Sequence, residues 1–187
     1  MRDDIIQIRW HGRGGQGAIT AAKIVANAAF SSGYSGVVMT PTFGTERRGA
    51  PVLTSLKIAK DKIYDLSPIS EPDMVMVFDS LLLTEVGVTN GLRSGGLMML
   101  NSPRPPAEYA NGSMTVATAD VTSFAAGAGL PTGIINTGMI GLFAKATGLL
   151  DLDILLEAVG EEFTGRNPEK NIEAARAVYK NTMIGES

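Results

Sequence analysis

Apolar residues are arranged along the first two thirds of the chain in short runs separated by longer helical stretches. Residues 74–78 and 97–100 are continuously apolar, and residues 114–118 form a further segment in which apolar residues outnumber threonines. Runs of this kind are typical of strands buried on both faces, which are usually central and parallel. Residues 5–10 and 36–39 predict two earlier strands, and residues 16–31 predict a helix between them. The pattern therefore predicts an α/β fold with a mixed, largely parallel sheet flanked by helices.

Residues 52–58 depart from this pattern. Their side chains alternate with the period of two that is typical of a half-buried strand, and residues 63–66 follow after a short turn. We expect these two segments to form a β-hairpin inserted into the α/β chain.

The last third of the chain has helical periodicity. Helices are predicted over residues 121–128, 135–147, 152–163 and 168–183, and a shorter one over residues 81–86 with Ser80 as its cap. Asn167 suits an N-cap and Pro168 suits the first helical position. We therefore expect a helical C-terminal third.

Glycines are concentrated between the first predicted strand and the first predicted helix. This glycine loop consists of Gly12, Arg13, Gly14, Gly15, Gln16 and Gly17. Glycines let the backbone adopt conformations in which amide N–H groups at a helix start converge on an anion, most often phosphate. The alternative is that the glycines only allow the strand and the helix to pack closely.

The loop matches neither of the two best-known phosphate loops. Ala18 and Ile19 follow its last glycine, so it lacks the lysine and hydroxyl of a Walker A loop. A nicotinamide site would need an acidic residue at the end of the next strand, where the chain has residues 40–42, Thr-Pro-Thr. This weakens a nicotinamide interpretation without excluding it.

A second candidate segment follows the next predicted strand. This basic loop consists of Thr45, Glu46, Arg47, Arg48 and Gly49. Guanidinium groups bind phosphate in a bidentate fashion, although a solvated turn or a salt bridge to another subunit is the competing interpretation. Both loops follow predicted strands, and open α/β sheets bind ligands at the carboxyl ends of their strands.

Composition narrows the function classes. The 187 residues fit a single domain over residues 1–187, and the absence of cysteine excludes thiolate ligands for an iron–sulfur cluster. The only histidine, His11, leaves no Ser/His/Asp arrangement and no multi-histidine metal site, so we assign no catalytic residue and no metal ligand.

Charge and hydropathy argue against two classes of partner. The formal charge is −3, which does not favour a nucleic-acid binder. The N-terminus has no apolar signal core, and no apolar run approaches the length of a membrane span. We therefore expect a cytoplasmic protein with neither nucleic acid nor membrane as partner.

Five motifs in order resemble the gamma subunit of the 2-oxoacid:ferredoxin oxidoreductases, and the residues around His11 and Arg13 are most similar to its pyruvate and branched-chain members. The motifs are the glycine loop with Thr20-Ala21-Ala22, residues 43–51, Pro72-Asp73, Asn101-Ser102 and Asn136-Thr137. The resemblance covers nearly the whole chain, from about residue 6 to about residue 159.

The resemblance implies an enzyme complex that oxidatively decarboxylates a 2-oxoacid, with pyruvate favoured, and forms acyl-CoA, carbon dioxide and reduced ferredoxin. It implies that thiamine diphosphate, magnesium and iron–sulfur clusters lie on partner subunits, and that ferredoxin accepts the electrons. The partners implied are alpha and beta subunits and, in some complexes, a ferredoxin-like delta subunit.

By the same resemblance, this chain contributes subunit contacts and binds coenzyme A. The glycine loop and the basic loop would face its diphosphate and 3′-phosphate. Asn101 and Asn136 join the candidate residues, although asparagines at element ends cap as often as they bind. Two alternatives remain: an assembly subunit that binds no ligand, and, more remotely, a nicotinamide-dependent oxidoreductase.

Overall fold

The computed structural model describes residues 5–42 and 48–185. It contains seven strands and six α-helices in these ranges, together with a short 3-10 helix at Pro106–Glu108. The strands are β1 (Ile6–Arg13), β2 (Gly36–Thr42), β3 (Pro51–Ala59), β4 (Met74–Val77), β5 (Gly96–Asn101), β6 (Met114–Ala119) and β7 (Met183–Gly185). The helices are α1 (Ala18–Ser31), α2 (Leu82–Glu85), α3 (Val121–Gly127), α4 (Asn136–Thr147), α5 (Leu152–Glu162) and α6 (Pro168–Asn181).

All seven strands form one mixed sheet with the order β2-β3-β1-β4-β5-β6-β7. Strands β1, β4, β5 and β6 pair in parallel, whereas β3 is antiparallel to both of its neighbours and β7 is antiparallel to β6. The predicted α/β fold with a largely parallel sheet is confirmed. The carboxyl ends of the four parallel strands lie at one edge of the sheet, which we call the carboxyl edge.

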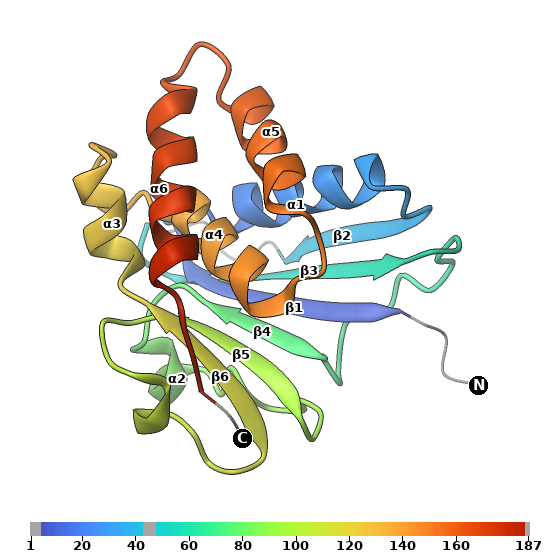
Figure 1. Ribbon diagram of the computed structural model, residues 1–187. Coiled ribbons are helices and arrows are strands. Elements are labelled where there is room, and N and C mark those ends of the chain that lie inside the picture. The colour runs from blue at the N-terminus through green and yellow to red at the C-terminus, as the bar shows by residue number, and fades with distance from the viewer. Residues whose placement is uncertain (1–4, 43–47, 186–187) are drawn as a thin grey trace.

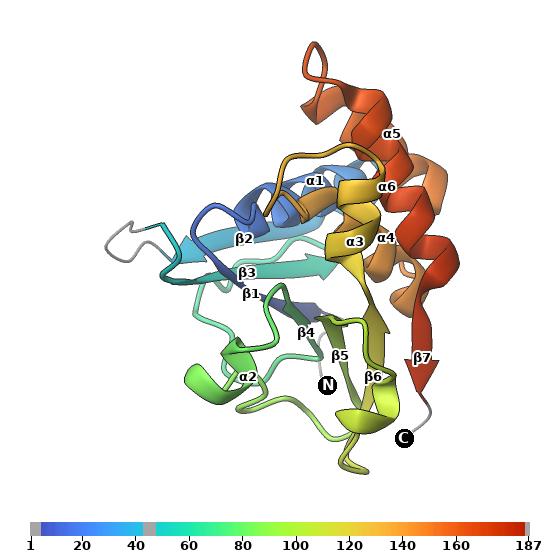
Figure 2. The same cartoon turned by 90° about the vertical axis from the view of Figure 1, so that its left-hand side faces the viewer.

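The helices cover the two faces of the sheet unequally. Among the described α-helices, α1 and α3–α6 lie on one face, and the short α2 lies on the other (Figures 1 and 2). The larger core fills the space under the five helices, with Trp10 fully buried between Phe78 and Phe143 at ring-centroid distances of 6.4 and 6.0 Å. A smaller cluster, which includes Val75, Val77 and Leu82, packs beneath α2. Trp10 therefore has a packing role.

The inserted hairpin is formed by different strands from those predicted. It is formed by β2 and β3, which pair from Gly36 with Ala59 to Thr42 with Leu53, and residues 63–66 are not a strand. The reason is that β1 and β2 occupy both edges of β3 and leave residues 63–66 no strand to pair with. The basic loop therefore connects the two strands of the hairpin.

Residues 60–72 are held instead by a side-chain contact. The Lys57 side chain is only 5% exposed, and its Nζ donates to Asp65 Oδ2 at 2.9 Å and to the Asp65 carbonyl at 3.1 Å. The bond from the Ser67 hydroxyl, followed by those from Lys57 and the Ser67 amide, keeps the pKa of Asp65 well below its usual range. This ion pair fixes the segment that sequence patterning assigned to a strand.

Several predicted boundaries are shifted. The last helix ends at Asn181 and Thr182 is extended, so that Met183 begins the short strand β7. The side chain of Asp79, rather than that of Ser80, accepts from the Leu81 amide at 3.0 Å before α2. Asn167 occupies the N-cap of α6 with φ 56° but makes no capping bond through its side chain to a described residue. Among the described residues, no helix has the length and apolarity that a membrane crossing requires.

Candidate functional site

The glycine loop lies at the carboxyl edge, between the end of β1 and the start of α1 (Figure 1). The strands β4, β5 and β6 end at the same edge because they are parallel to β1. Helix α4 also begins here, since the first residue of α4, Asn136, lies against Gly17 at the start of α1. The structure thus brings the glycine loop, Arg48, Gly49, Asn101 and Asn136 to one edge.

Two hydrogen bonds close the glycine loop on itself. The Arg13 amide donates to Gln16 Oε1 at 2.8 Å, and the Gln16 amide donates to the Arg13 carbonyl at 3.0 Å. Gly15 and Gly17 have φ values of 99° and 81°, which side-chain-bearing residues rarely adopt. The Gln16 side chain therefore shapes the loop.

The N-terminus of α1 has the features of an anion site. No side chain of a described residue caps it, and its first turn contains no acidic residue. The first amides of a helix lack intrahelical acceptors, and the helix dipole adds about half a positive charge at this end. The α1 start can therefore take a phosphate.

Close packing explains two of the four glycines. A Cβ placed on Gly12 would lie 3.0 Å from the Cβ of Ala18, and one placed on Gly17 would lie 2.9 Å from the Cβ and Nδ2 of Asn136. Gly15 is different, because its nearest neighbour would be Arg48 Cγ at 3.9 Å. The packing interpretation thus applies to Gly12 and Gly17, while Gly15 is exposed and faces the arginine.

The hairpin is bonded directly to the glycine loop. The Gly14 amide donates to the Ala50 carbonyl at 2.9 Å, and the Gly49 amide donates to the Gly14 carbonyl at 3.1 Å. This pair of bonds sets the exposed Arg48 beside Gly15. The remaining members of the basic loop, Thr45, Glu46 and Arg47, lie outside the described residues.

Arg13 binds two carboxylates. Its Nε donates to Asp79 Oδ2 at 2.5 Å, its Nη2 donates to Glu85 Oε1 at 2.8 Å, and its Nη1 donates to the Gly49 carbonyl at 3.3 Å. Hydrogen bonds to Glu85 and then to Asp79 raise the pKa of Arg13 above its ordinary value. No motif in the sequence links Arg13 to either carboxylate, because Asp79 and Glu85 lie 66 and 72 residues away along the chain.

The two asparagines make different contacts. Asn101 Nδ2 donates to the Phe78 carbonyl and to Thr122 Oγ1, both at 3.0 Å, so this side chain ties the ends of β4 and β5 to α3. Asn136 is buried, and its Oδ1 accepts from the Thr137 amide at 2.9 Å. The other end of the Asn136 amide, Nδ2, faces Gly17.

His11 lies two residues before Arg13 and is 7% exposed. Its Nε2 has no hydrogen-bond partner among the described residues. Burial, with a smaller contribution from the charge of Arg9, lowers the pKa of His11 to about 4. The imidazole is therefore neutral near pH 7, and the geometry gives it no group to activate.

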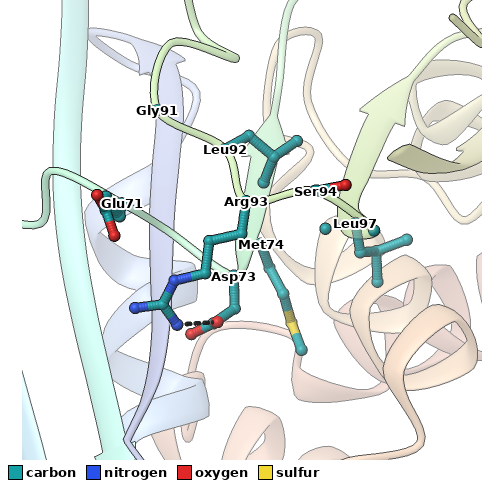
Figure 3. Close-up of a pocket in the computed structure, with 10 residues that line it drawn as sticks. Glu71, Asp73, Met74, Gly91, Leu92, Arg93, Ser94 and Leu97 are labelled. Carbon is teal, nitrogen blue, oxygen red and sulfur yellow. Dashed lines mark hydrogen bonds and ion pairs between the residues drawn. The ribbon is translucent and has the colours of Figure 1, made fainter. Parts of the chain in front are cut away.

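A pocket of about 730 Å³ lies at the opposite, amino edge of the sheet. Figure 3 shows Arg93 paired with Asp73 at its wall. The Asp73 carboxylate also accepts from the Gln7 amide at 2.8 Å, which ties β1 to the start of β4. This pocket is remote from the glycine loop, and within residues 5–42 and 48–185 no cluster of acidic or histidine side chains is suited to hold a metal ion.

Comparison with known proteins gives a consistent result over nearly the whole chain. Residues 7–181 match the family model described as pyruvate ferredoxin/flavodoxin oxidoreductase. A protein of Thermococcus kodakarensis, the "Pyruvate/ketoisovalerate oxidoreductases common subunit gamma", is 43% identical over 187 residues, which cover 97% of this chain and 100% of that protein.

Two solved structures share the fold. The pyruvate oxidoreductase subunit PORC of Thermotoga maritima superposes with a TM-score of 0.83 at 29% identity and covers 97% of this chain and 99% of its own. The 2-oxoglutarate:ferredoxin oxidoreductase of Magnetococcus marinus, with 2-oxoglutarate, coenzyme A and succinyl-CoA bound, has a TM-score of 0.76 at 18% identity. The match covers 94% of this chain but 31% of that one, and at this identity it shows the fold alone.

Proposed function

This chain belongs to the pyruvate ferredoxin/flavodoxin oxidoreductase family, as a gamma subunit of a pyruvate or 2-oxoacid ferredoxin oxidoreductase complex, and on this premise we propose that it binds coenzyme A at the carboxyl edge. The observation that carries the proposal is the uncapped start of α1 with Arg48 beside Gly15. Helix amides and a guanidinium are the two kinds of donor that phosphate groups favour.

In this proposal, different groups at the carboxyl edge bind different phosphate groups of coenzyme A. The first amides of α1, with Asn136 Nδ2 nearby, take the diphosphate, and Arg48 and Arg47 take a phosphate oxygen each. Gly15 allows the ligand to approach the backbone. Coenzyme A is also bound in the Magnetococcus marinus enzyme, 31% of whose chain is covered by the match to this fold.

The chemistry of the reaction is proposed to lie on other chains. Without cysteine, this chain has no thiolate for an iron–sulfur cluster, and it also lacks the Gly-Asp-Gly motif that opens the thiamine diphosphate–magnesium site of the family's catalytic subunit. We propose that alpha and beta subunits, with a ferredoxin-like delta subunit where one is present, hold these cofactors and pass electrons to ferredoxin. Pyruvate is the favoured 2-oxoacid, and the cytoplasm is the proposed location.

We also propose that residues 1–187 act as a single domain within the complex. The larger core runs from β1 to α6 without interruption among the described residues, which supports one folding unit. The domain would present its carboxyl edge to the subunit that holds thiamine diphosphate.

The test is calorimetric binding of coenzyme A to the assembled complex. Arg48→Ala removes a charge-assisted hydrogen bond worth about 1.5–3 kcal/mol, so the Kd for coenzyme A should rise on the order of tenfold or more. Arg104→Ala is a matched control, since Arg104 is an exposed arginine that pairs with Glu108 on a different loop. An unchanged Kd with impaired assembly would favour the assembly-only role instead.

A further inference from the structure

The guanidinium of Arg13 connects three parts of the fold that are distant in the sequence. Asp79 follows β4, Glu85 ends α2, and Gly49 precedes β3. We propose that Arg13 positions the coenzyme A site rather than binding a phosphate itself. The inference rests on the proposed function, and it assigns to the arginine of the glycine loop a different role from that of Arg48.

The charges around Arg13 disfavour direct phosphate binding. One guanidinium faces two carboxylates, so the cluster of Arg13, Asp79 and Glu85 carries a net negative charge. A phosphate that approached Arg13 would compete with both carboxylates and would be repelled by them. The charge-assisted bonds of this arginine are already made within the chain.

Arg13 makes contacts with both the glycine loop and the basic loop, which are the loops proposed to bind coenzyme A. Its backbone begins the turn that Gln16 closes, and its Nη1 bonds the carbonyl of Gly49, whose amide bonds Gly14. Arg48 directly precedes Gly49 and lies beside Gly15. The guanidinium thus adds a third bond to the two backbone bonds that hold Arg48 near the start of α1, and simultaneous contact with two phosphate groups depends on that arrangement.

Glu85→Gln distinguishes a positioning role from a binding role by the sign of its effect. If Arg13 bound phosphate, removing a competing carboxylate would strengthen coenzyme A binding. If Arg13 positions the loops, the weaker contact would loosen them, and the Kd should rise roughly two- to fivefold, the range expected for one partly exposed ion pair. The measurement is calorimetric binding to the assembled complex, with the KM for coenzyme A and for the 2-oxoacid as a second readout.

Two substitutions at Arg13 add an independent test. Arg13→Ala should raise the Kd and KM for coenzyme A on the order of tenfold while leaving the KM for the 2-oxoacid unchanged. Arg13→Lys keeps the charge but loses the planar fork that reaches three partners. Lysine should therefore behave like alanine, whereas recovery of wild-type binding by lysine would overturn the positioning role.

The control is Glu108→Gln, which removes an exposed ion pair with Arg104 elsewhere on the surface and should leave the Kd unchanged. Two outcomes would overturn this inference alone. One is a lower Kd for coenzyme A in Glu85→Gln. The other is an unchanged Kd in both Glu85→Gln and Arg13→Ala while Arg48→Ala weakens binding. If Arg48→Ala also has no effect, the proposed coenzyme A site itself is wrong.

Discussion

Gly17→Ala should destabilise the protein more than Gly33→Ala, although both glycines flank the same helix with nearly the same positive φ. Gly17 precedes α1 with φ 81° and Gly33 follows it with φ 87°. An L-residue in this left-handed region costs about 1–2 kcal/mol, so strain alone predicts similar losses for the two variants.

The surroundings of the two glycines differ. An added Cβ at Gly33 has no heavy atom within 4 Å, whereas one at Gly17 would lie 2.9 Å from the Cβ and Nδ2 of Asn136. Asn136 is buried at the start of α4 and cannot move aside without shifting that helix. Overpacking of this kind costs typically about 1–3 kcal/mol more.

Urea unfolding of both variants, followed by circular dichroism, gives the difference in free energy. We expect Gly17→Ala to lose roughly 2–5 kcal/mol and Gly33→Ala roughly 1–2 kcal/mol. In a thermal scan, each kcal/mol corresponds to about 2–4 °C in Tm for a chain of this size. Equal losses in the two variants would show that α1 and α4 do not approach each other as closely as the structure indicates.

Three further predictions concern stability. The pKa of His11 is lowered to about 4 in the folded state, so the unfolded chain takes up a proton at a higher pH than the folded chain does. The free energy of unfolding should therefore be highest above about pH 6.5 and fall by up to about 3 kcal/mol toward pH 4. His11→Gln should flatten this dependence of the free energy on pH, measured by urea unfolding. Asp65→Ala leaves the buried Lys57 without its carboxylate and should lower the urea midpoint more than Lys57→Met does; the reverse order would contradict the ion-pair argument. Asp120 caps α3 through a 3.0 Å bond from the Ser123 amide, so Asp120→Ala should cost about 1 kcal/mol in the same assay, and no loss would mean that the cap is not formed in solution.

The parallel core could be predicted from sequence because its signal is local. Residues 74–78 are apolar at every position, and a strand buried on both faces requires that pattern. The glycine loop was also predictable, since the strand, the glycines and the helix are contiguous. Helix α1 begins at Ala18, two residues later than expected, because Gly17 takes the left-handed conformation of its N-cap.

The hairpin and the role of Arg13 depend on contacts between distant residues. The alternation in residues 52–58 correctly predicts a strand but does not say which strands will lie on either side of it, and β1 and β2 take both edges. Arg13 meets Asp79 and Glu85 at sequence separations of 66 and 72. The sequence does offer one signal for this contact, since Asp79 follows β4, the parallel neighbour of β1. Residues that follow neighbouring parallel strands lie close together at the carboxyl edge.

The charge balance at the carboxyl edge bears on whether this chain can hold coenzyme A without help. The start of α1 supplies about half a positive charge and Arg48 supplies one, whereas the cluster around Arg13 is negative overall. Arg47 adds a further positive charge by sequence. These groups offset only part of the charge on a diphosphate and a 3′-phosphate together. We therefore expect a neighbouring subunit to add positive charge at this edge, so that coenzyme A should bind the assembled complex more tightly than the separate chain.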